Sequence, residues 1–344
     1  RDRLRSRGLG DVYKRQTQRY KESYDQLPQN LILGSETAST VSSRGVYKFP
    51  VEDKKSTKYE DHQCSSYDVE ACSWSNIPDE DFALADDNHW TIGQFVWTGF
   101  DYLGEPSPYD TDAWPNHSSM FGIIDLASLP KDRYYLYRSV WNKDAETLHI
   151  LPHWTWPGRE GEVTPVFVYT NYPTAELFIN GKSYGKQSKN NSSLKNRYRL
   201  MWMDAVYEPG EVKVVAYNKE GKAVAEKVVR TAGKAHHIEL VSNRNELTAD
   251  GKDLAYVTVK VVDKDGNLCP TDNRQINFSA KGTGKYRAAA NGDPTNLEQF
   301  HLPKMHAFNG MLTAIIQAGE TAGEIVFTAK ANGVKAGNIR IQTK

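Results

Sequence analysis

A short apolar run that stops abruptly is the strongest pattern in the first third of the chain. Residues 31–33 are Leu-Ile-Leu, and Gly-Ser and then Glu36 follow at once. Such a run is typical of a strand buried on both faces, as in a parallel sheet covered by helices. A carboxylate that follows a buried strand lies where barrel enzymes hold their catalytic groups. An ordinary role for Glu36, in a cap or a loop salt bridge, stays open at this point.

A second β-rich run and two helical patterns accompany this strand. Residues 94–97 (QFVW) end at Thr-Gly, and a turn-rich segment with aromatic and acidic residues follows. Residues 17–27 place Tyr and Leu side chains at helical spacing before a Pro, and residues 131–141 place aromatic rings on one helical face. Residues 41–87 are polar and aromatic, and a loop of that length is usually functional or partly helical. The order of helix, strand and long loop predicts the last part of an α/β repeat.

From Thr147 onward the pattern changes to short strands separated by turn residues. Within residues 146–231, strands are predicted at 163–169, 175–179, 200–205, 210–217 and 223–229. Asn180-Gly181, after the second of these, is a tight hairpin signal. Within residues 232–344, strands are predicted at 238–242, 255–262, 275–280, 310–318 and 323–331. Regular short strands with turns between them predict two immunoglobulin-like β-sandwiches joined by a linker at 231–235.

The composition is that of an ordinary globular protein of two or three domains. The 344 residues are 39% hydrophobic and 25% charged, and the formal net charge is zero. A zero balance gives no argument for nucleic acid or an anionic membrane, and no apolar run of about 18 residues predicts a transmembrane helix. The aromatic fraction of 11% is high. Exposed aromatic faces suit sugar rings, although Trp and Tyr also fill cores.

Cysteine and histidine patterns predict neither a disulfide framework nor a metal site. The three cysteines are Cys64, Cys72 and Cys269, and the first two lie in one loop where they could pair. Spacing alone cannot decide that pairing, which stays open. The nine His residues are scattered, so neither a metal nor a cofactor is predicted.

Residues 1–16 differ from the rest of the chain. They carry six basic and two acidic residues without any apolar period. No apolar core follows the charges, so the segment does not resemble a signal peptide. We interpret it as a non-native segment, because it is similar to translated adapter sequence, with a disordered basic arm as the alternative.

Two long motifs surround Glu36 and the second β-rich run: LILGSETAST at residues 31–40 and GQFVWTGFDYLGEP at residues 93–106. Together they resemble glycoside hydrolase family 2, most closely its β-galactosidase branch. FGIID at 121–125 and PKDRYYLY at 130–137 continue the resemblance. Two motifs in this order, separated by a loop of suitable length, are a much more specific signal than either motif alone.

The resemblance implies that residues 17–145 are the end of a (β/α)8 TIM barrel, with its last two strands and last helix. Glu36 would be the nucleophile that ends the seventh strand, and Trp97 would end the eighth and line the sugar subsite. Asp101 and Glu105 could bind sugar hydroxyls or a cation. Packing at the barrel top is the alternative for Trp97, and exposure to water is the alternative for the two acids.

The same resemblance implies that part of the enzyme is missing. Retaining hydrolysis needs two carboxyl groups about 5–5.5 Å apart, a nucleophile and an acid/base. The family places its acid/base Glu after an Asn at the end of the fourth strand, and no such pair follows a strand of the barrel-like part. A full barrel takes about 250 residues. We therefore expect a C-terminal fragment that is inactive by itself.

The family also carries an immunoglobulin-like module directly behind its barrel, which agrees with the sandwich predicted at 146–231. Residues 247–263 resemble bacterial invasin-type immunoglobulin domains, and residues 291–294 and 308–311 resemble the C-terminal module of the same enzymes. We expect both modules to be scaffolding, with carbohydrate binding as the alternative, because a sandwich fold does not imply a function.

The predicted function is that of a retaining exo-glycosidase that hydrolyses terminal β-D-galactosides by double displacement. Its partner would be a β-galactoside oligosaccharide or polysaccharide, without nucleic acid or membrane insertion. A β-glucuronidase or β-mannosidase of the same family is one alternative, and a non-catalytic carbohydrate-binding or adhesive β-sandwich protein is another. The resemblance also suggests a periplasmic or extracellular location. The sequence indicates no oligomeric state.

Overall fold

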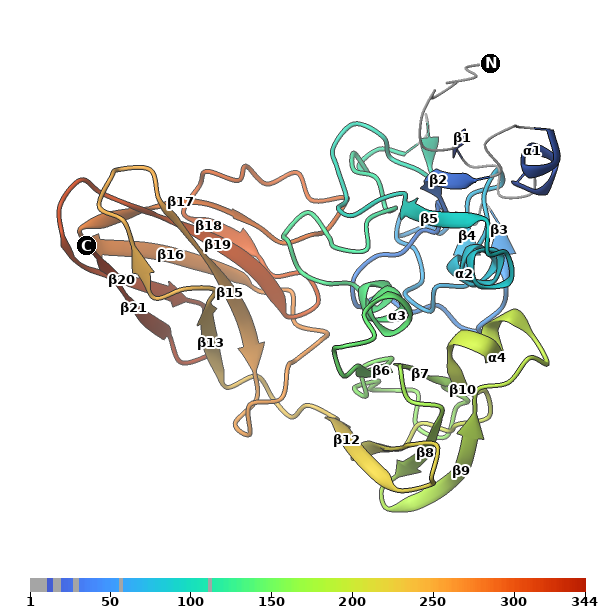
Figure 1. The fold of residues 1–344 in the computed structure, drawn as a ribbon. Helices are drawn as coiled ribbons and strands as arrows, with labels where there is room; N and C mark the ends of the chain where they lie inside the picture. The colour runs from blue at the N-terminus through green and yellow to red at the C-terminus, as the bar shows by residue number, and fades with distance from the viewer. Residues whose placement is uncertain (1–10, 15–19, 27–30, 56–57, 111–112) are drawn as a thin grey trace.

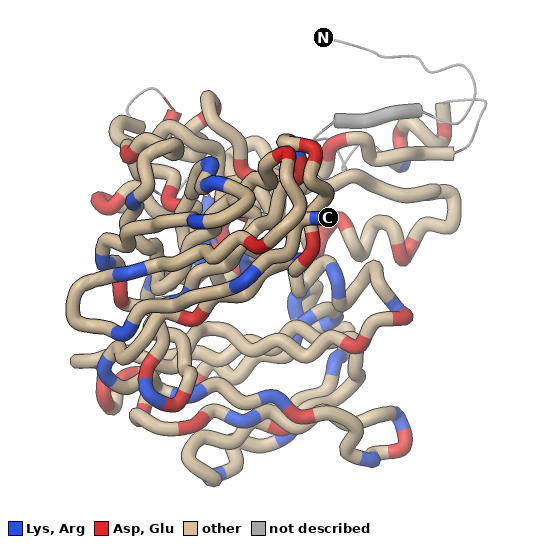
Figure 2. The backbone as a smooth tube through the Cα atoms, turned by 90° about the vertical axis from the view of Figure 1, so that its left-hand side faces the viewer, with Lys and Arg blue, Asp and Glu red and all other residues tan. Residues whose placement is uncertain are grey.

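The computed structural model describes residues 11–14, 20–26, 31–55, 58–110 and 113–344. A small parallel sheet with short helices comes first along the chain, and two β-sandwiches follow it (Figure 1). Lys and Arg are interspersed with Asp and Glu along the chain, as the zero net charge suggests (Figure 2). Among the described helices, none is long and apolar enough to cross a membrane.

The parallel sheet has the strand order β1-β2-β5, with β1 at Asp11–Lys14, β2 at Ile32–Thr37 and β5 at Thr91–Val96. Both pairings are parallel. Strands β2 and β5 correspond to the two runs predicted at 31–33 and 94–97. Strand β1 falls within residues 1–16, so the described part of that segment is paired in the sheet; the segment's origin stays a prediction.

Short helices accompany this sheet. They are α1 (Tyr20–Gln26), α2 (Pro78–Asp87) and α3 (Asp132–Trp141). Helices α1 and α3 coincide with the two helical patterns of the sequence. The loop from 41 to 87 contains α2 and a two-stranded pair of β3 (Lys54–Lys55) with β4 (Glu70–Ala71), so it is partly helical, as its length suggested.

Burial on both faces, expected for the first strand, is found for only part of this sheet. Ile32 is completely buried, whereas Leu31 is 41% exposed. On β5, Ile92 is 48% and Phe95 is 62% exposed. The reason is geometric, because β5 is the edge of a three-stranded sheet and the described helices cover only part of it.

The first sandwich packs a three-stranded sheet, β10-β7-β6, against a four-stranded sheet, β12-β11-β8-β9. Its elements are β6 (Leu148–Leu151), β7 (Val166–Thr170), β8 (Thr174–Ile179), β9 (Lys182–Ser188), α4 (Leu194–Tyr198), β10 (Leu200–Trp202), β11 (Glu211–Tyr217) and β12 (Ala223–Arg230). Asn180 and Gly181 join β8 to β9 with φ of 49° and 80°. Positive φ at both central residues is what a tight type I′ hairpin requires, so this turn is confirmed.

The second sandwich has a four-stranded sheet, β13-β15-β19-β17, and a five-stranded sheet, β14-β21-β20-β16-β18. Its strands are β13 (His237–Ser242), β14 (Glu246–Leu247), β15 (Leu254–Val262), β16 (Gln275–Gly282), β17 (Gly284–Ala290), β18 (Lys304–His306), β19 (Met311–Ala318), β20 (Gly323–Lys330) and β21 (Gly337–Thr343). Alternate residues of these strands, such as Val257, Val259 and Val261, form one apolar core.

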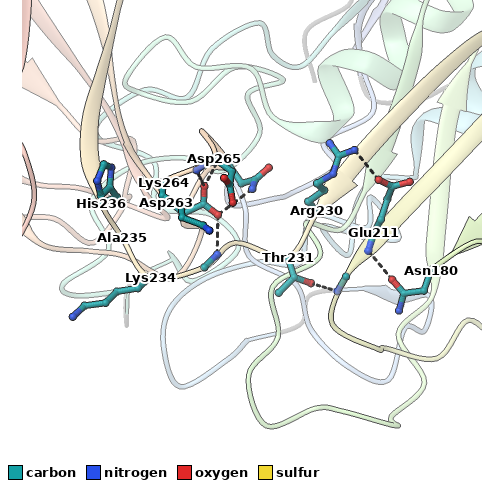
Figure 3. A pocket seen from close by; sticks show the side chains of 13 residues that line it. Asn180, Glu211, Arg230, Thr231, Lys234, Ala235, His236, Asp263, Lys264 and Asp265 are labelled. Carbon is teal, nitrogen blue, oxygen red and sulfur yellow. Dashed lines mark hydrogen bonds and ion pairs between the residues drawn. The ribbon is translucent and has the colours of Figure 1, made fainter.

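A cleft of about 800 Å³ separates the two sandwiches at the linker that joins them (Figure 3). Arg230 and Glu211 line one side of the cleft and form an ion pair. Asp263 lines the other side and accepts a hydrogen bond from the backbone N–H of Gly233 in the linker, at 2.8 Å. The chain therefore leaves the first sandwich and is fixed to the second within a few residues.

Candidate active site

The C-terminal ends of β2 and β5 lie side by side and hold the candidate nucleophile. Glu36 is the penultimate residue of β2 and is 6% exposed. Thr37 pairs with Val96 across the sheet, and its carbonyl accepts a hydrogen bond from the Trp97 N–H at 2.9 Å. The hydroxyl of Thr37 donates to the carbonyl of Phe95 at 3.1 Å. Parallel pairing thus brings Glu36 and Trp97, 61 positions apart in the sequence, to the same end of the sheet.

The loop that follows Glu36 is polar and completely buried. Ser39 and Thr40 are both 0% exposed. The Ser39 N–H donates to the Ser75 hydroxyl at 2.6 Å, and the Thr40 hydroxyl donates to the Asn76 carbonyl at 3.1 Å. A buried polar loop is stable only when its groups are hydrogen-bonded in this way. The segment after Glu36 is therefore a buried turn rather than an exposed loop, hydrogen-bonded through the Ser39 backbone and the Thr40 hydroxyl.

Helix α2 places a second buried carboxyl group under this turn. Asp81 accepts a hydrogen bond from the Asn76 side-chain amide at 2.7 Å and is 2% exposed. Burial raises the pKa of Asp81 to about 7, although hydrogen bonds from Asn76 and the Ala38 backbone act to lower it. Sequence reasoning missed this residue, because nothing in an acidic helix start shows which of its carboxyl groups faces inward.

Trp97 packs against an aromatic and acidic pair from the turn-rich segment after β5. The rings of Trp97 and Tyr102 meet edge to face, with centroids 6.0 Å apart. The Tyr102 hydroxyl donates to the Glu105 carboxylate. Trp97 and Glu105 are both half-buried, so the predicted sugar-binding residues lie together through Tyr102. Tyr102 itself was not predicted to have a role.

Asp101, by contrast, is engaged within the protein. Its carboxylate forms an ion pair with Lys131 at 2.7 Å and accepts the Gly122 N–H at 2.8 Å. Burial raises the pKa of Asp101 above its ordinary value, and the Lys131 ammonium beside it opposes that rise. A carboxylate held in this way connects loops. Asp101 therefore serves the framework of the candidate site, and its predicted contact with the sugar stays a prediction.

The two cysteines that could have paired lie beside the site without a disulfide between them. Cys64 and Cys72 are buried in one cluster with Tyr109 and Phe121, and Trp97 and Tyr102 pack against that cluster. Burial raises the pKa of the Cys64 thiol well above its ordinary value. Both cysteine side chains therefore fill part of the apolar cluster against which Trp97 and Tyr102 pack.

Within the described ranges, no group of three or more His, Cys, Asp or Glu side chains is arranged to hold a metal ion.

A buried carboxyl group in β4, Glu70, borders the site, and the Tyr59 hydroxyl donates to it. Its burial raises the pKa of Glu70 above its ordinary value. Sequence reasoning did not single out Glu70, since only the packed structure shows that it faces inward.

Comparison with known proteins connects this geometry to a family. The model for glycoside hydrolase family 2 C-terminal domain 5 matches residues 238–340, and a domain of unknown function matches residues 161–225. The β-galactosidase BoGH2A of Bacteroides ovatus is 40% identical over 326 residues, which cover 92% of this chain and 37% of that protein. The chain belongs to glycoside hydrolase family 2.

Other family 2 relatives differ in the activity that their names give. A β-glucuronidase of Formosa agariphila is 23% identical over 274 residues, covering 78% of this chain and 27% of that protein. The crystal structure of a β-glycosidase from Bacteroides vulgatus superposes with a TM-score of 0.81 at 28% identity, covering 94% of this chain and 43% of that one. The chain thus spans less than half the length of each of these glycosidases.

Family 2 membership agrees with the sandwich-rich architecture. The matched model for the C-terminal domain spans most of the second sandwich, and the other matched domain lies within the first. The residues of the candidate site, from Glu36 to Glu105, lie outside both of these ranges. Their roles therefore rest on the geometry at the ends of β2 and β5.

Proposed function

We propose that this chain carries the nucleophile half of the active site of a retaining β-galactosidase that acts on terminal β-D-galactosides of oligosaccharides or polysaccharides. In this proposal β2 and β5 are the seventh and eighth strands of a (β/α)8 barrel, and α3 is its last helix. The observation that carries it is the parallel pairing of β2 with β5, which sets Glu36 and Trp97 at one strand end. Barrel enzymes hold catalytic groups at that end.

Glu36 would act as the nucleophile of a double displacement. A carboxylate oxygen attacks the anomeric carbon while the bond from that carbon to the leaving oxygen breaks, and a second carboxyl group protonates the leaving oxygen. Water, deprotonated by that second group, then cleaves the glycosyl–enzyme ester and releases Glu36. The second group would come from an upstream strand, since the sequence of the barrel-like part contains no Asn-Glu pair after a strand.

Trp97 would provide a flat apolar face for the pyranose ring, with Tyr102 fixing its orientation by edge-to-face packing. Glu105 is held by the Tyr102 hydroxyl and would accept a hydrogen bond from a sugar hydroxyl at the same rim. These three residues come from one segment of chain. The Trp97 ring and the Glu105 carboxylate would therefore move together.

Two relatives support different sugars. The 40% identity to a protein named β-galactosidase favours a galactoside, and it spans nearly the whole chain. A β-glucuronidase remains the second candidate, because a relative with that name also aligns over most of the chain. A purely adhesive protein would give no reason for a buried Glu36 at the end of a sheet strand.

The decisive experiment is Glu36→Gln in the full-length enzyme that contains this chain. We expect kcat for an aryl β-galactoside to fall on the order of 10⁴-fold, because loss of a catalytic nucleophile has effects of that size. A 2-fluoro-galactoside should form a covalent adduct at Glu36 in the wild-type enzyme. Glu105→Gln is the matched control and should mainly raise KM.

The outcome separates the candidates. Unchanged turnover in the Glu36→Gln enzyme, together with no adduct at Glu36, would show that the proposed nucleophile is wrong. Faster hydrolysis of an aryl β-glucuronide than of an aryl β-galactoside would select the second candidate. The 344-residue chain by itself should hydrolyse neither substrate, because retaining hydrolysis needs a second carboxyl group.

A further inference from the structure

The second sandwich packs directly against the loops that build the candidate site. Among the described residues, four segments of the first part of the chain contact it: the turn after Glu36, the loop around Gln63, the hairpin after β5, and the loop before α3. On the sandwich side the contacts come from residues 291–294 and 308–309. Figure 1 shows the loops between β5 and α3 lying between the parallel sheet and this sandwich.

Arg44 is the centre of this junction. It lies at the end of the buried turn after Glu36, is 7% exposed, and forms an ion pair with Asp125 at 2.6 Å. Its guanidinium also donates to the carbonyl oxygens of Asn291 at 2.7 Å and Phe308 at 3.1 Å. The Arg44 carbonyl in turn accepts the Asn309 side-chain amide at 2.8 Å. One residue of the site loop is thus bonded to two separate turns of the sandwich.

Asp125 connects the same junction to the loop before α3. It is 1% exposed, and its second carboxylate oxygen accepts the N–H groups of Ala127 at 2.8 Å and Leu129 at 2.9 Å. Gly292 of the sandwich approaches so closely that a Cβ there would lie 1.9 Å from the Asp125 carboxylate. The φ of Gly292 is +83°, a conformation that also favours glycine. The two modules therefore fit each other at backbone distance.

A second set of contacts reaches the hairpin that carries Tyr102 and Glu105. The His117 N–H donates to the Pro294 carbonyl of the sandwich at 3.1 Å, and the His117 carbonyl accepts the Gly104 N–H at 2.9 Å. The Gln63 amide donates to the Asp293 carboxylate at 2.9 Å. The segment 291–294 thus contacts the hairpin at His117. His117 in turn bonds Gly104, which is the residue next to Glu105.

A buried Arg–Asp pair, here between two loops of the first part of the chain, is a costly feature to place at a contact with another module if adhesion is all that is needed. Its desolvation offsets much of its attraction, so such pairs are weak evidence for stability, and a unique register is the better-attested gain. Here the pair fixes the loop after Glu36 and the loop before α3 against the same two turns of the sandwich. This arrangement therefore fixes the position of the loop after Glu36 relative to the loop before α3.

We propose that the second sandwich positions the loops of the sugar site. Arg44 and Asp125, which belong to those loops, are the positioning residues through which it acts. They set the loop that follows the nucleophile against the hairpin that carries the sugar-binding aromatics. This inference rests on the proposed glycosidase function. It goes beyond that function, because it makes the residues around Asn291 and Phe308 necessary for efficient turnover although they contact no substrate.

Asn309→Gly is the mildest test in the full-length enzyme. It removes the side-chain amide that bonds Arg44, and glycine readily adopts the φ of 52° found at Asn309, so the variant should fold. Arg44→Lys is the stronger test, because a lysine keeps the charge but cannot bond Asp125 and two carbonyls with one planar group. Arg340→Gln, which breaks an exposed ion pair within the same sandwich, is the matched control.

We expect Arg44→Lys to lower kcat/KM for an aryl galactoside on the order of 10- to 100-fold, as small misplacements of catalytic groups do. Asn309→Gly should show the same effect to a smaller extent. In the 344-residue chain, both should accelerate amide hydrogen exchange in residues 101–119, and Arg340→Gln should change neither measurement. All assays are run well below the thermal midpoint of each variant, so that a lower stability alone does not reduce activity.

The outcomes separate this inference from the proposed function. If Glu36→Gln abolishes turnover while Arg44→Lys and Asn309→Gly keep wild-type kcat/KM and wild-type exchange, the positioning role is wrong and the glycosidase function stands. If Glu36→Gln keeps full turnover, the proposed function is wrong. Whatever the activity results, unchanged hydrogen exchange in residues 101–119 of the Arg44→Lys chain would overturn the coupling between the second sandwich and the hairpin.

Discussion

At the scale of single residues, two buried carboxyl groups in the first part of the chain, Asp81 of α2 and Asp68, have raised pKa values. Burial raises the pKa of Asp81 to about 7, and it raises the pKa of Asp68 to about 7 although Arg133 and Arg199 lie beside it. An unfolded Asp has a pKa of about 3.9. The folded state therefore binds more protons than the unfolded state between about pH 4 and pH 7. Stability present at low pH is lost as the pH rises through the folded pKa.

Asp81→Asn should remove part of this pH dependence. The amide cannot ionise, and its oxygen still accepts the hydrogen bond from Asn76. The free energy of unfolding, measured by urea denaturation, should fall less between pH 5 and pH 8 in the variant than in the wild type, by on the order of 1–3 kcal/mol. The exposed Asp204 provides the control, since Asp204→Asn should leave the slope of the free energy of unfolding against pH unchanged. Equal slopes for wild type and Asp81→Asn would show that Asp81 ionises normally in the folded state.

At the scale of elements, the start of α3 is bonded to the two loops that form the site. Lys131 precedes the helix, is 1% exposed and pairs with Asp101 after β5. Its ammonium also donates to the Ser42 carbonyl at 2.6 Å, in the turn after Glu36. Burial lowers the pKa of Lys131, and Asp101 opposes that change. One charged side chain therefore connects a helix, a hairpin and the turn after Glu36.

Lys131→Met should destabilise the chain by about 3–5 kcal/mol, because it leaves Asp101 buried without its counter-charge. The double variant Lys131→Met/Asp101→Asn should recover much of that loss, since the uncompensated charge is gone. Urea denaturation of the wild type, both single variants and the double variant gives the coupling energy. The exposed Lys143 serves as the control position. Additive effects of the two single changes would mean that the pair is not coupled.

At the scale of the whole molecule, the linker between the two sandwiches is hydrogen-bonded at both ends. Thr231 and Ala232 donate to Trp154 and Thr155 beside the first sandwich, and Gly233 donates to the second. Asp263 accepts the N–H groups of Gly233 at 2.8 Å and of Asp265 and Asn267 at 2.9 Å. Burial acts to raise its pKa, but these hydrogen bonds outweigh burial and lower the pKa of Asp263 to about 2. The contribution to stability is therefore complete above about pH 4 and is lost as the pH falls through 2.

Asp263→Ala should free the linker from the second sandwich. Trypsin should then cut after Lys234 several times faster than in the wild type, because local unfolding of the linker controls cleavage. Rates are read from the appearance of the two sandwich fragments on a gel. Asp265→Ala is the matched control, since that exposed side chain lies in the same turn and the cleavage site is retained. Equal cleavage rates for wild type and Asp263→Ala would contradict a clamp at this position.

Local patterns predicted most of the elements. The apolar run before Glu36 became β2, the run before Trp97 became β5, and Asn180-Gly181 became a hairpin turn, because each of these depends on a few neighbouring residues. The pairing that places Glu36 beside Trp97 followed from a resemblance and was not contained in either run. The buried ion pair of Asp101 was not predicted, because its partner Lys131 lies 30 positions away. The sugar-binding role of Asp101 stays a prediction.

The sequence by itself determined where many of the strands and the Asn180-Gly181 turn form, and which carboxylate stands at the end of a strand, although it missed strands such as β9, β17 and β21. Those features follow from side-chain alternation, backbone preferences and the order of residues along a few turns of chain. Only the tertiary structure decided which acids are buried, that Arg44 and Asp125 form an ion pair, and that the second sandwich contacts the site loops. These properties depend on desolvation and on contacts between residues far apart in the chain, such as Arg44 and Asn291. Chain order alone does not contain that information.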